Sequence, residues 1–380
     1  MASLYLHIPF CLSKCPYCDF YSCTPQAGDL DRYVDALCLD LKASRAFCRT
    51  EEFSAPFRSV FFGGGTPSLL SAAQVARILD VTEGEYGIAT DAEITLEANP
   101  GTVSSESLAG YHSAGVNRLS LGVQSFDDEL LKWLGRRHNG AQALQAIDLA
   151  RNAGFERLSI DLMFSLPQQT MKQLSQQIQL VEQLSPEHLS VYGLTIEEQT
   201  PFAQQFEAGL WQMPDDEQYR EGFLSIDSAL TSQGYGHYEI SNYAKQGYEC
   251  QHNLGYWQRQ PYLGVGSGAH TFMDCGWGER WSCENSVVAY LDAVERGISP
   301  RNKIEGFDRA QAMFESVYLM LRCRNGVNER DFERQYGKSF AIIYEQSIER
   351  CAPYLTLNDG CWRLSNDGWL LYNYLIENFL

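Results

Sequence analysis

Three cysteines near the start of the chain could together hold a metal cluster. Cys11, Cys15 and Cys18 follow a short apolar run with the spacing CxxxCxxC. Iron-sulfur clusters are usually held by four Cys thiolates, so three local sulfurs leave one iron of a cubane free to bind a small molecule. The alternative is a structural zinc site completed by His7 or Cys23, although zinc ligands usually arrive as two halves of the CxxC type. The spacing therefore favours an open iron-sulfur site.

The elements that must position these cysteines alternate between strands and helices over the first 200 residues. We expect strands at 3–8, 59–62, 93–97, 118–123, 158–163 and 188–194. Apolar residues three and four positions apart predict helices at 30–48, 72–82, 104–114, 141–153 and 171–184. This alternation is typical of an α/β fold with a parallel sheet. Six βα units are too few for a closed eight-stranded barrel, so we expect a partial (β/α)6 TIM-like barrel.

Polar groups follow the expected strands at their carboxyl ends. The cysteine loop follows the first strand, and GlyGlyGlyThrPro at 63–67 follows the second. The third, fourth and fifth strands end at Glu97, Gln124 and Asp161. Loops at this end of a barrel carry the chemistry, whereas the strands supply packing. We therefore expect one ligand surrounded by all of these loops.

Several of these residues also have simpler explanations. The glycines could form only a tight turn, or they could bring bare backbone against an ammonium or carboxylate group. The turn lacks the Lys of a phosphate loop, which disfavours a nucleotide phosphate. Glu97 could be a solvated charge at a strand end. Arg136 could pair with a ligand carboxylate or lie on the surface, and the adjacent Arg137 offers the same charge.

Charge and cysteine content narrow the class of partner. The 380-residue chain has a formal net charge of −19 at pH 7, which discourages long-range attraction to nucleic acid or to an anionic membrane. Neither a bilayer-spanning apolar run nor a secretory signal is expected. We therefore expect a cytoplasmic protein, in which the 12 cysteines stay reduced and serve as cluster ligands or as buried small hydrophobes.

Six segments together resemble the radical S-adenosylmethionine (SAM) superfamily, and within it the branch related to oxygen-independent coproporphyrinogen III dehydrogenase. They are HIPFCLSKCPYCDF, FFGGGTPS, EANP, RLSLGVQSF, LGRRH and DLMFSLP, and the resemblance spans nearly the whole chain. In the superfamily the amino and carboxylate groups of SAM bind the fourth iron of a 4Fe-4S cluster. The resemblance implies a cluster on the three cysteines. It also implies SAM contacts at Tyr5, Tyr17, Gly64, Gly65, Thr66, Glu97, Gln124, Arg136 and Asp161.

Two departures from the dehydrogenase pattern favour the heme-chaperone group of this branch. The dehydrogenase has CxxxCxxCxC, whereas Phe20 stands two residues beyond Cys18 here. The dehydrogenase also has a long extension before its cluster, where this chain has ten residues. A third, smaller departure is Ser165, which precedes LeuPro where relatives often have Gly. It leaves the geometry of that turn open but touches no expected ligand.

The segment HNLGYW at 252–257 matches the HNxxYW motif that is associated with heme in the chaperone group. A neutral imidazole is a common axial ligand of heme iron, and Tyr and Trp offer flat apolar surfaces to a porphyrin. The alternative for His252 is a core histidine with satisfied hydrogen bonds. The resemblance implies that heme binds at His252 and passes to an apo-hemoprotein. We expect peripheral association where that acceptor lies in a membrane.

Two rival functions remain open at this point. A radical SAM oxidoreductase would cleave SAM and abstract a propionate hydrogen from coproporphyrinogen III, and Phe20 in place of a fourth cysteine counts against it. A zinc-stabilised binding protein with an idle barrel is the second rival. The oxidoreductase differs from a heme chaperone in the product that it forms, and the zinc protein differs in the metal that it holds.

The remainder of the chain loses the βα alternation. In residues 201–300 we expect a connector at 201–214, a helix at 216–233 and a strand and loop at 234–243, with Tyr238 and Glu239 as further site candidates. Residues 301–380 predict helices at 309–322 and 329–336 and a hairpin around AsnAspGly, which is typical of a winged-helix-like lobe. The nearly balanced charge of this lobe favours a lid or a partner surface. The expected domains are therefore 1–200, 201–300 and 301–380.

Overall fold

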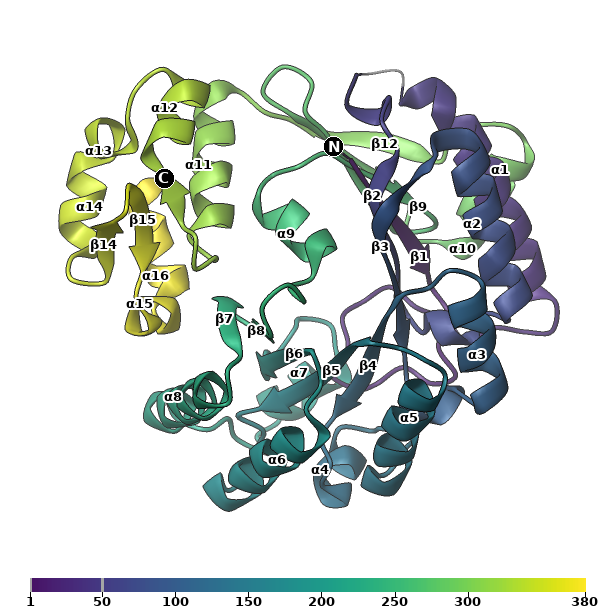
Figure 1. Cartoon of the computed structure of the whole chain (residues 1–380), viewed down its shortest axis with the longest axis horizontal. Coiled ribbons are helices and arrows are strands. Elements are labelled where there is room, and N and C mark those ends of the chain that lie inside the picture. The colour runs from purple at the N-terminus through teal and green to yellow at the C-terminus, as the bar shows by residue number, and fades with distance from the viewer. Residues whose placement is uncertain (1, 49–50) are drawn as a thin grey trace.

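One curved sheet with helices along its outer face forms most of the molecule, and a smaller lobe lies beside it (Figure 1). The computed structural model describes residues 2–48 and 51–380. Among these residues the large sheet has twelve strands, in the order β12-β11-β10-β9-β1-β2-β3-β4-β5-β6-β8-β7. No helix in this part of the chain combines the length and the apolar character that a bilayer crossing requires.

The six central strands are parallel neighbours and form the expected partial barrel. They are β1 Ser3–Ile8, β2 Phe57–Gly64, β3 Ile88–Ala98, β4 Arg118–Gln124, β5 Arg157–Phe164 and β6 His188–Gly193. The helices between them are α1 Asp29–Phe47, α2 Ala72–Tyr86, α3 Ser105–Ser113, α4 Asp128–Trp133, α5 Gly140–Asn152 and α6 Met171–Leu184. The sequence analysis missed only α4, because six residues are too few to show a helical period.

Local sequence explains where these helices begin. Ser71, Ser104, Asn139 and Thr170 each cap a helix, and the residue three positions later bonds back to close a capping box. The strands between them are almost continuously buried because helices cover one face and the barrel interior lies on the other. This packing holds the carboxyl ends of the strands, and therefore the loops that follow them, in fixed positions.

Four further strands, which the sequence analysis did not predict, extend the sheet beyond β1. They are β9 Tyr262–Val265, β10 His270–Met273, β11 Glu279–Cys283 and β12 Arg301–Gly306, of which β9 runs parallel to β1. These strands are short, and β9 and β12 contain glycines that read as turns. At Gly264 a Cβ would collide with the backbone carbonyl of His270, so the close approach of β9 and β10 requires glycine there.

The other edge of the sheet carries the strand and loop expected at 234–243. Strands β7 Gly236–Glu239 and β8 Asn242–Ala244 pair antiparallel, and β8 pairs with β6. The remaining helices of this region are α7 Pro201–Glu207, α8 Asp216–Ser232, α9 Gln251–Trp257 and α10 Val287–Glu295. Short 3-10 turns lie at Glu51–Phe53, Pro67–Leu69, Pro100–Thr102 and Glu377–Phe379.

The C-terminal lobe combines helices with a three-stranded sheet. Its elements are α11 Arg309–Met320, β13 Val327–Asn328, α12 Glu329–Tyr336, α13 Phe340–Ile343, α14 Glu345–Cys351, β14 Leu355–Asn358, β15 Cys361–Leu364, α15 Asn366–Leu370 and α16 Tyr372–Ile376. The expected hairpin is β14 and β15, joined by Asp359 and Gly360, both at positive φ. The border expected before residue 301 falls inside the large sheet, because β12 pairs with β11; we propose that the lobe begins after β12.

Candidate functional site

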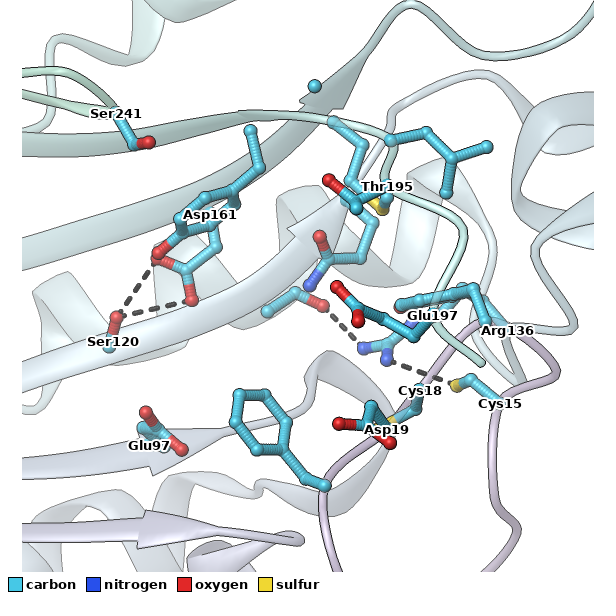
Figure 2. Close-up of a pocket in the computed structure, with 18 of the residues that line it drawn as sticks. Cys15, Cys18, Asp19, Glu97, Ser120, Arg136, Asp161, Thr195, Glu197 and Ser241 are labelled. Atoms are coloured by element: carbon cyan, nitrogen blue, oxygen red, sulfur yellow. Dashed lines mark hydrogen bonds between the residues drawn. The ribbon is translucent and has the colours of Figure 1, made fainter. Parts of the chain in front are cut away.

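A cavity of about 1240 Å³ opens at the carboxyl ends of the central strands and reaches the C-terminal lobe. Figure 2 shows Cys15, Cys18 and Arg136 on one side of it, and Asp161 and Ser241 on the other. The cavity is lined by all of the residues that the sequence analysis proposed around SAM and the cluster, except Tyr5. The strand-end loops therefore converge as expected, although the role of each residue stays a prediction.

The cysteine loop is held in place by backbone contacts that leave its thiols half-exposed. The Cys11 N–H donates to the Cys23 carbonyl at 3.0 Å, and the Cys23 N–H donates to the Pro9 carbonyl at 2.8 Å. The Cys18 N–H donates to the Cys15 carbonyl at 3.1 Å, closing a turn between these two residues. Burial raises the pKa of the Cys18 thiol, so its thiolate form needs a positive partner such as cluster iron.

A chain of polar contacts joins two of the cysteines through side chains from other loops. The Thr66 hydroxyl donates to Cys11 Sγ at 3.4 Å and accepts from Asn99 Nδ2 at 3.0 Å. Arg136 donates from Nη2 to Asn99 Oδ1 at 2.5 Å and from Nη1 to Cys15 Sγ at 3.6 Å. Hydrogen bonds from a cation and a hydroxyl to cysteine sulfur stabilise the thiolate form that a cluster requires.

Arg136 and Arg137 both line the cavity, and Arg136 is the one that hydrogen-bonds to a cysteine of the CxxxCxxC loop and to Asn99. The Nη2 atom of Arg136 also donates to the Gly122 carbonyl at 2.5 Å, while its buried Nε has no hydrogen-bond partner in the part of the chain that the structure describes. Arg137 is exposed and its Nη1 reaches only the Leu12 carbonyl, at 3.4 Å. A buried guanidinium N–H without an acceptor suits a ligand carboxylate, because an unpaired buried donor is costly.

The glycines after β2 are required by packing as well as by backbone conformation. Gly64 has φ +106°, and a Cβ there would lie 2.6 Å from His7 Cε1. A Cβ at Gly65 would lie 2.7 Å from the Phe10 carbonyl oxygen. Side chains at these positions would push β2 away from the entry to the cysteine loop. The glycines therefore let the second loop lie directly against the first.

Two carboxylates face the cavity from neighbouring strands. Burial, together with the nearby charge of Asp161, raises the pKa of Glu97 to about 8. Burial also raises the pKa of Asp161, whose oxygens accept hydrogen bonds from Ser120 Oγ at 3.1 and 3.3 Å. The charge of Arg118 offsets part of both shifts, but among the described residues Arg118 forms its ion pair with Glu93 and not with Glu97 or Asp161. A ligand that carries ammonium or sulfonium charge would supply both carboxylates with a direct partner. Glu97 is therefore not a solvated strand-end charge.

Gln124 reaches the cavity from a distorted strand end. It has φ +66°, and the pairing of β4 with β5 shifts register between Gly122 and Gln124. A residue other than glycine in this conformation is uncommon and costs free energy. The bulge turns the Gln124 amide into the cavity, where the regular strand would direct the side chain elsewhere.

The donor set fits a cluster bound by three cysteines better than it fits a single zinc ion. Among residues 2–48 and 51–380, no three His, Cys, Asp or Glu side chains converge as the ligands of one metal ion do. In a cubane each cysteine binds a different iron, so the sulfurs lie further apart. His7, the expected alternative ligand, bonds through Nδ1 to the Tyr5 hydroxyl and through Nε2 to the Tyr21 carbonyl, both at 3.1 Å.

The two tyrosines expected near SAM lie differently. Tyr17 lines the cavity beside Cys15 and packs against Phe202, with ring centroids 6.2 Å apart. Tyr5 is not among the lining residues in the described part of the chain, and its ring packs against Phe61 and His252 behind the strand ends. A SAM contact at Tyr5 stays a prediction that this geometry does not support directly.

His252, the expected heme ligand, lies in the interior of the molecule and not on the cavity wall. Its side chain is on α9, and the residue is only 1 % exposed. Nδ1 lies 2.9 Å from Ser59 Oγ, and Nε2 lies 2.8 Å from the Tyr256 hydroxyl. Because Ser59 donates its own proton to Ser3, it accepts from Nδ1–H and leaves Nε2 to accept from Tyr256. Coordination of heme iron by Nε2 would require Tyr256 to leave.

Burial and the charge of Arg118 lower the pKa of His252 to about 3, so the imidazole is neutral. Its ring also stacks on Phe61, with centroids 4.9 Å apart. These are the properties of a core histidine with satisfied hydrogen bonds, the alternative that the sequence left open. Heme ligation by His252 therefore stays a prediction, and it would require α9 to rearrange.

Several cavity residues escaped the sequence analysis. Asn99 is the centre of the contact chain between Cys11 and Cys15. Its position in the EANP segment could have indicated it as a site residue. His138, in LGRRH, bonds to the Val123 carbonyl at 3.0 Å, and burial lowers its pKa to about 4. Tyr192 and Arg322 also line the cavity, but neither belongs to a segment that suggested a site.

Comparison with known proteins identifies the family of this chain. The profile described as "Radical SAM superfamily" matches residues 5–181, and "HemN C-terminal domain" matches residues 307–371. A protein of Haemophilus influenzae named heme chaperone HemW is 38% identical over 387 residues, covering 100% of this chain and 97% of that protein. HemW of Escherichia coli is 38% identical over 384 residues, covering 100% and 98%. The chain belongs to the HemW family of radical SAM proteins.

HemW relatives also occur in more distant bacteria. The HemW of Bacillus subtilis is 36% identical over 384 residues and covers 100% of this chain. The solved structure of coproporphyrinogen III oxidase HemN from E. coli, a radical SAM enzyme, has a TM-score of 0.83 at 23% identity, covering 100% of this chain and 89% of HemN. That likeness confirms the α/β fold with its radical SAM core and C-terminal lobe.

Proposed function

We propose that this protein is a heme chaperone that binds a 4Fe-4S cluster, SAM and heme, and delivers heme to apo-hemoproteins. The observation that carries the proposal is the full-length relationship to proteins named heme chaperone HemW. Phe20 stands where the dehydrogenase pattern has a fourth cysteine, and it is 68 % exposed at the cavity. Its partners would be heme and the apo-hemoprotein, with no role for nucleic acid.

In this proposal Cys11, Cys15 and Cys18 hold the cluster, and the fourth iron binds the amino and carboxylate groups of SAM. The cluster would supply one-electron chemistry and a docking point for SAM. Arg136 would neutralise the carboxylate of the ligand, since its buried Nε has no partner among the residues that the structure describes. Glu97 and Asp161 would face the positive groups of SAM, while Gly64, Gly65, Thr66, Tyr17 and Gln124 would shape the remaining contacts.

We also propose that the protein acts in the cytoplasm and that it meets membrane hemoproteins by peripheral association. All 12 cysteines are free thiols, as a reducing compartment would keep them. The strong negative charge of the chain makes anionic lipid an unsuitable partner, so contact with the acceptor protein would carry the association.

An oxygen-free assay separates the chaperone from the oxidoreductase. The HemN-like fold and a cavity that extends past the SAM residues make coproporphyrinogen III a reasonable alternative ligand. Protein with a full cluster is supplied with reductant, SAM and coproporphyrinogen III, and in a parallel sample with heme and an apo-hemoprotein. The proposal predicts heme transfer without protoporphyrinogen. Stoichiometric protoporphyrinogen together with no heme transfer would establish the oxidoreductase instead.

A further inference from the structure

The cavity is larger than the site of one small molecule. Pockets for a single ligand usually enclose roughly 300 to 1,000 Å³, whereas this one measures about 1240 Å³. The SAM candidates occupy the part next to the cysteines. The remaining part lies where β6, the β7–β8 turn and the C-terminal lobe meet, and the SAM candidates leave its residues unexplained.

This outer part of the cavity has mainly apolar and aromatic walls. They are formed by Met163, Tyr192, Tyr219, Ile240, Leu371 and Tyr374. Tyr192 is 40 % exposed, and as a cavity-lining residue it presents that surface to the cavity. Flat side chains and aliphatic groups of this kind suit a large planar apolar ligand such as a tetrapyrrole.

Arg322 adds a positive charge to these walls. Its Nη2 donates to Glu239 Oε2 at 3.2 Å, and its Nε has no partner within residues 2–48 and 51–380. Of its three guanidinium nitrogens, only Nη2 has an acceptor among the described residues, so the group retains donors for a second carboxylate. Arginine commonly binds carboxylates through two parallel hydrogen bonds.

The end of the HNxxYW segment holds this arginine in place. The Arg322 guanidinium lies 4.4 Å above the ring of Trp257 and 5.7 Å from that of Tyr372. Glu239, which is fully buried, fixes the other side of the group. The Ile240 N–H donates to the Arg322 carbonyl at 3.2 Å, so the backbone is fixed as well. Trp257 is thus a positioning residue for Arg322.

The contacts of α9 offer a route by which the buried His252 could influence heme binding in the cavity. His252 bonds to Ser59 in β2 and to Tyr256 within α9, and Trp257 is the next residue on that helix. Two backbone N–H groups at the start of α9, those of Gln251 and His252, donate to the buried Glu93 at 3.2 Å. The helix is therefore fixed at its start and along one face. A change at His252 would reach the cavity through Trp257.

We propose that the outer part of the cavity binds heme and that Arg322 receives one of its propionate carboxylates. This inference rests on the proposed heme chaperone function and assigns it a site. His252 then acts as a positioning residue through α9, and iron ligation by its imidazole is not required for heme to enter the cavity.

The first test compares two ligands on the same protein. Cluster-loaded wild-type protein is titrated with heme and with heme dimethyl ester, in which both propionates are esterified, and absorbance is followed in the Soret band. Loss of a charge-assisted hydrogen bond weakens binding by about ten- to a hundredfold. We expect the ester to bind more weakly than heme by that factor.

Variants then assign the difference to Arg322. Arg322→Gln should weaken heme about ten- to a hundredfold while leaving ester binding unchanged, and Arg322→Lys should restore part of the affinity. Arg324→Gln is the matched control, because Arg324 is exposed, lies over Trp369 and does not line the cavity. It should bind heme like the wild type.

A second variant guards against misfolding. Arg322→Gln leaves Glu239 buried without its cation, so the double variant Arg322→Gln with Glu239→Gln removes both charges. Its cluster absorbance and unfolding midpoint check the fold, and it should show the same loss of heme affinity. Equal binding of heme and ester by the wild type, with no loss in folded Arg322 variants, would overturn the inference and leave the chaperone function intact. A wild-type protein that binds neither ligand would overturn both.

Discussion

At the scale of single residues, the site is organised by unpaired charge. Among the described residues, Glu97 and Asp161 form no ion pair, although the charge of Arg118 acts on both, and Arg136 has a buried N–H without an acceptor. Each is costly in the empty cavity, because buried polar groups need partners. SAM carries a carboxylate and two positive groups, so it complements the cavity. Binding free energy would come from satisfying groups that folding leaves unsatisfied.

The affinity for SAM should depend on pH through Glu97. Its pKa of about 8, raised from 4.5, means that ligand-free protein carries this proton at neutral pH. A positive ligand favours the carboxylate, so binding releases the proton below pH 8. Affinity should therefore rise by up to tenfold per pH unit, at about pH 6 to 8, and then level off. Isothermal titration across this range measures the slope, and Glu97→Gln should remove it.

The raised pKa of Glu97 also determines how the free energy of unfolding changes with pH. Between about pH 4.5 and 8 the folded protein holds a proton on Glu97 that the unfolded chain has lost. The stability contribution is fully present below pH 4.5 and is lost as pH rises toward 8. Glu97→Gln should flatten this part of the stability profile in urea unfolding. An unchanged profile would show that Glu97 titrates normally.

Variants of Arg136 and Arg137 test which arginine binds the ligand carboxylate, with Arg137 as the control. Arg136→Gln removes the contacts to Asn99, Gly122 and Cys15, and SAM affinity should fall about ten- to a hundredfold. Arg137→Gln makes the same change in charge one residue away, on an exposed side chain, and should leave the affinity unchanged. Equal effects of both variants would mean that only the overall charge matters. Iron and sulfide content controls for cluster loss.

At the scale of elements, two strand ends carry backbone strain. Gln124, the last residue of β4, and Ser165, which follows β5, both have positive φ, at 66° and 55°. The Gln124 conformation delivers an amide to the cavity. Ser165 lines no part of it, and its buried hydroxyl has no partner among the described residues. The strain at Ser165 thus has no evident compensation.

Ser165→Gly should therefore stabilise the protein. Glycine adopts this conformation without the cost of about 1 kcal/mol that other residues bear, and it removes the unpaired hydroxyl. Glycine also makes the unfolded chain more flexible, which offsets part of this gain. We therefore expect the free energy of unfolding in urea to rise by about 0.5 to 1 kcal/mol. Gln168→Gly changes an exposed residue of similar φ, 65°, and should give a smaller gain. A loss of stability in Ser165→Gly would contradict this explanation.

Helix α9 allows a direct test of the role of His252. Tyr256→Phe removes the hydroxyl that bonds to Nε2 and leaves a buried nitrogen unpaired, which should cost about 1 to 2 kcal/mol of unfolding free energy. If His252 only positions the helix, heme affinity should stay close to that of the wild type. A clear gain in heme affinity, with a changed Soret maximum, would show that Nε2 binds the iron once it is released. Parallel urea and Soret titrations of the same preparation distinguish these results.

The central strands and their loops could be predicted because each signal is local. An apolar run, a polar residue at its end and a helical period lie within about twenty residues of one another, and parallel strands place their ends together. Strands β9 to β12 could not be predicted in this way. They are short, and only β9 pairs with β1, which lies more than 250 residues away along the chain; the other three strands pair in turn beyond β9.

The buried position of His252 could not be predicted from neighbouring residues in the sequence either. Its decisive partner, Ser59, is 193 residues away in sequence. The HNxxYW spacing shows that His252 and Tyr256 are four positions apart on one helix, but not which face meets the sheet. The position of Arg322 in the cavity wall likewise depends on the docking of the C-terminal lobe. Sequence reasoning thus selected residues that line one cavity, and it missed the contacts between distant segments.

At the scale of the whole molecule, the lobe closes one side of the barrel. The Arg324 N–H donates to the Tyr238 carbonyl at 2.9 Å, and Arg259 pairs with Glu315 at 2.6 Å, so both β7 and the end of α9 hold the lobe. The resulting cavity joins a region that suits a cluster and SAM to a region that suits a planar apolar ligand. In the proposed function, this continuity would allow SAM binding to be coupled to heme transfer.

The central claim is that SAM binds an iron that the protein leaves open. Electron-nuclear double resonance on oxygen-free, reduced protein tests it most directly, with SAM labelled at the amino nitrogen. The account predicts about four irons per chain and a hyperfine coupling from that nitrogen which disappears without SAM. A cluster signal that does not respond to SAM, or a preparation that holds about one zinc and no iron, would contradict it.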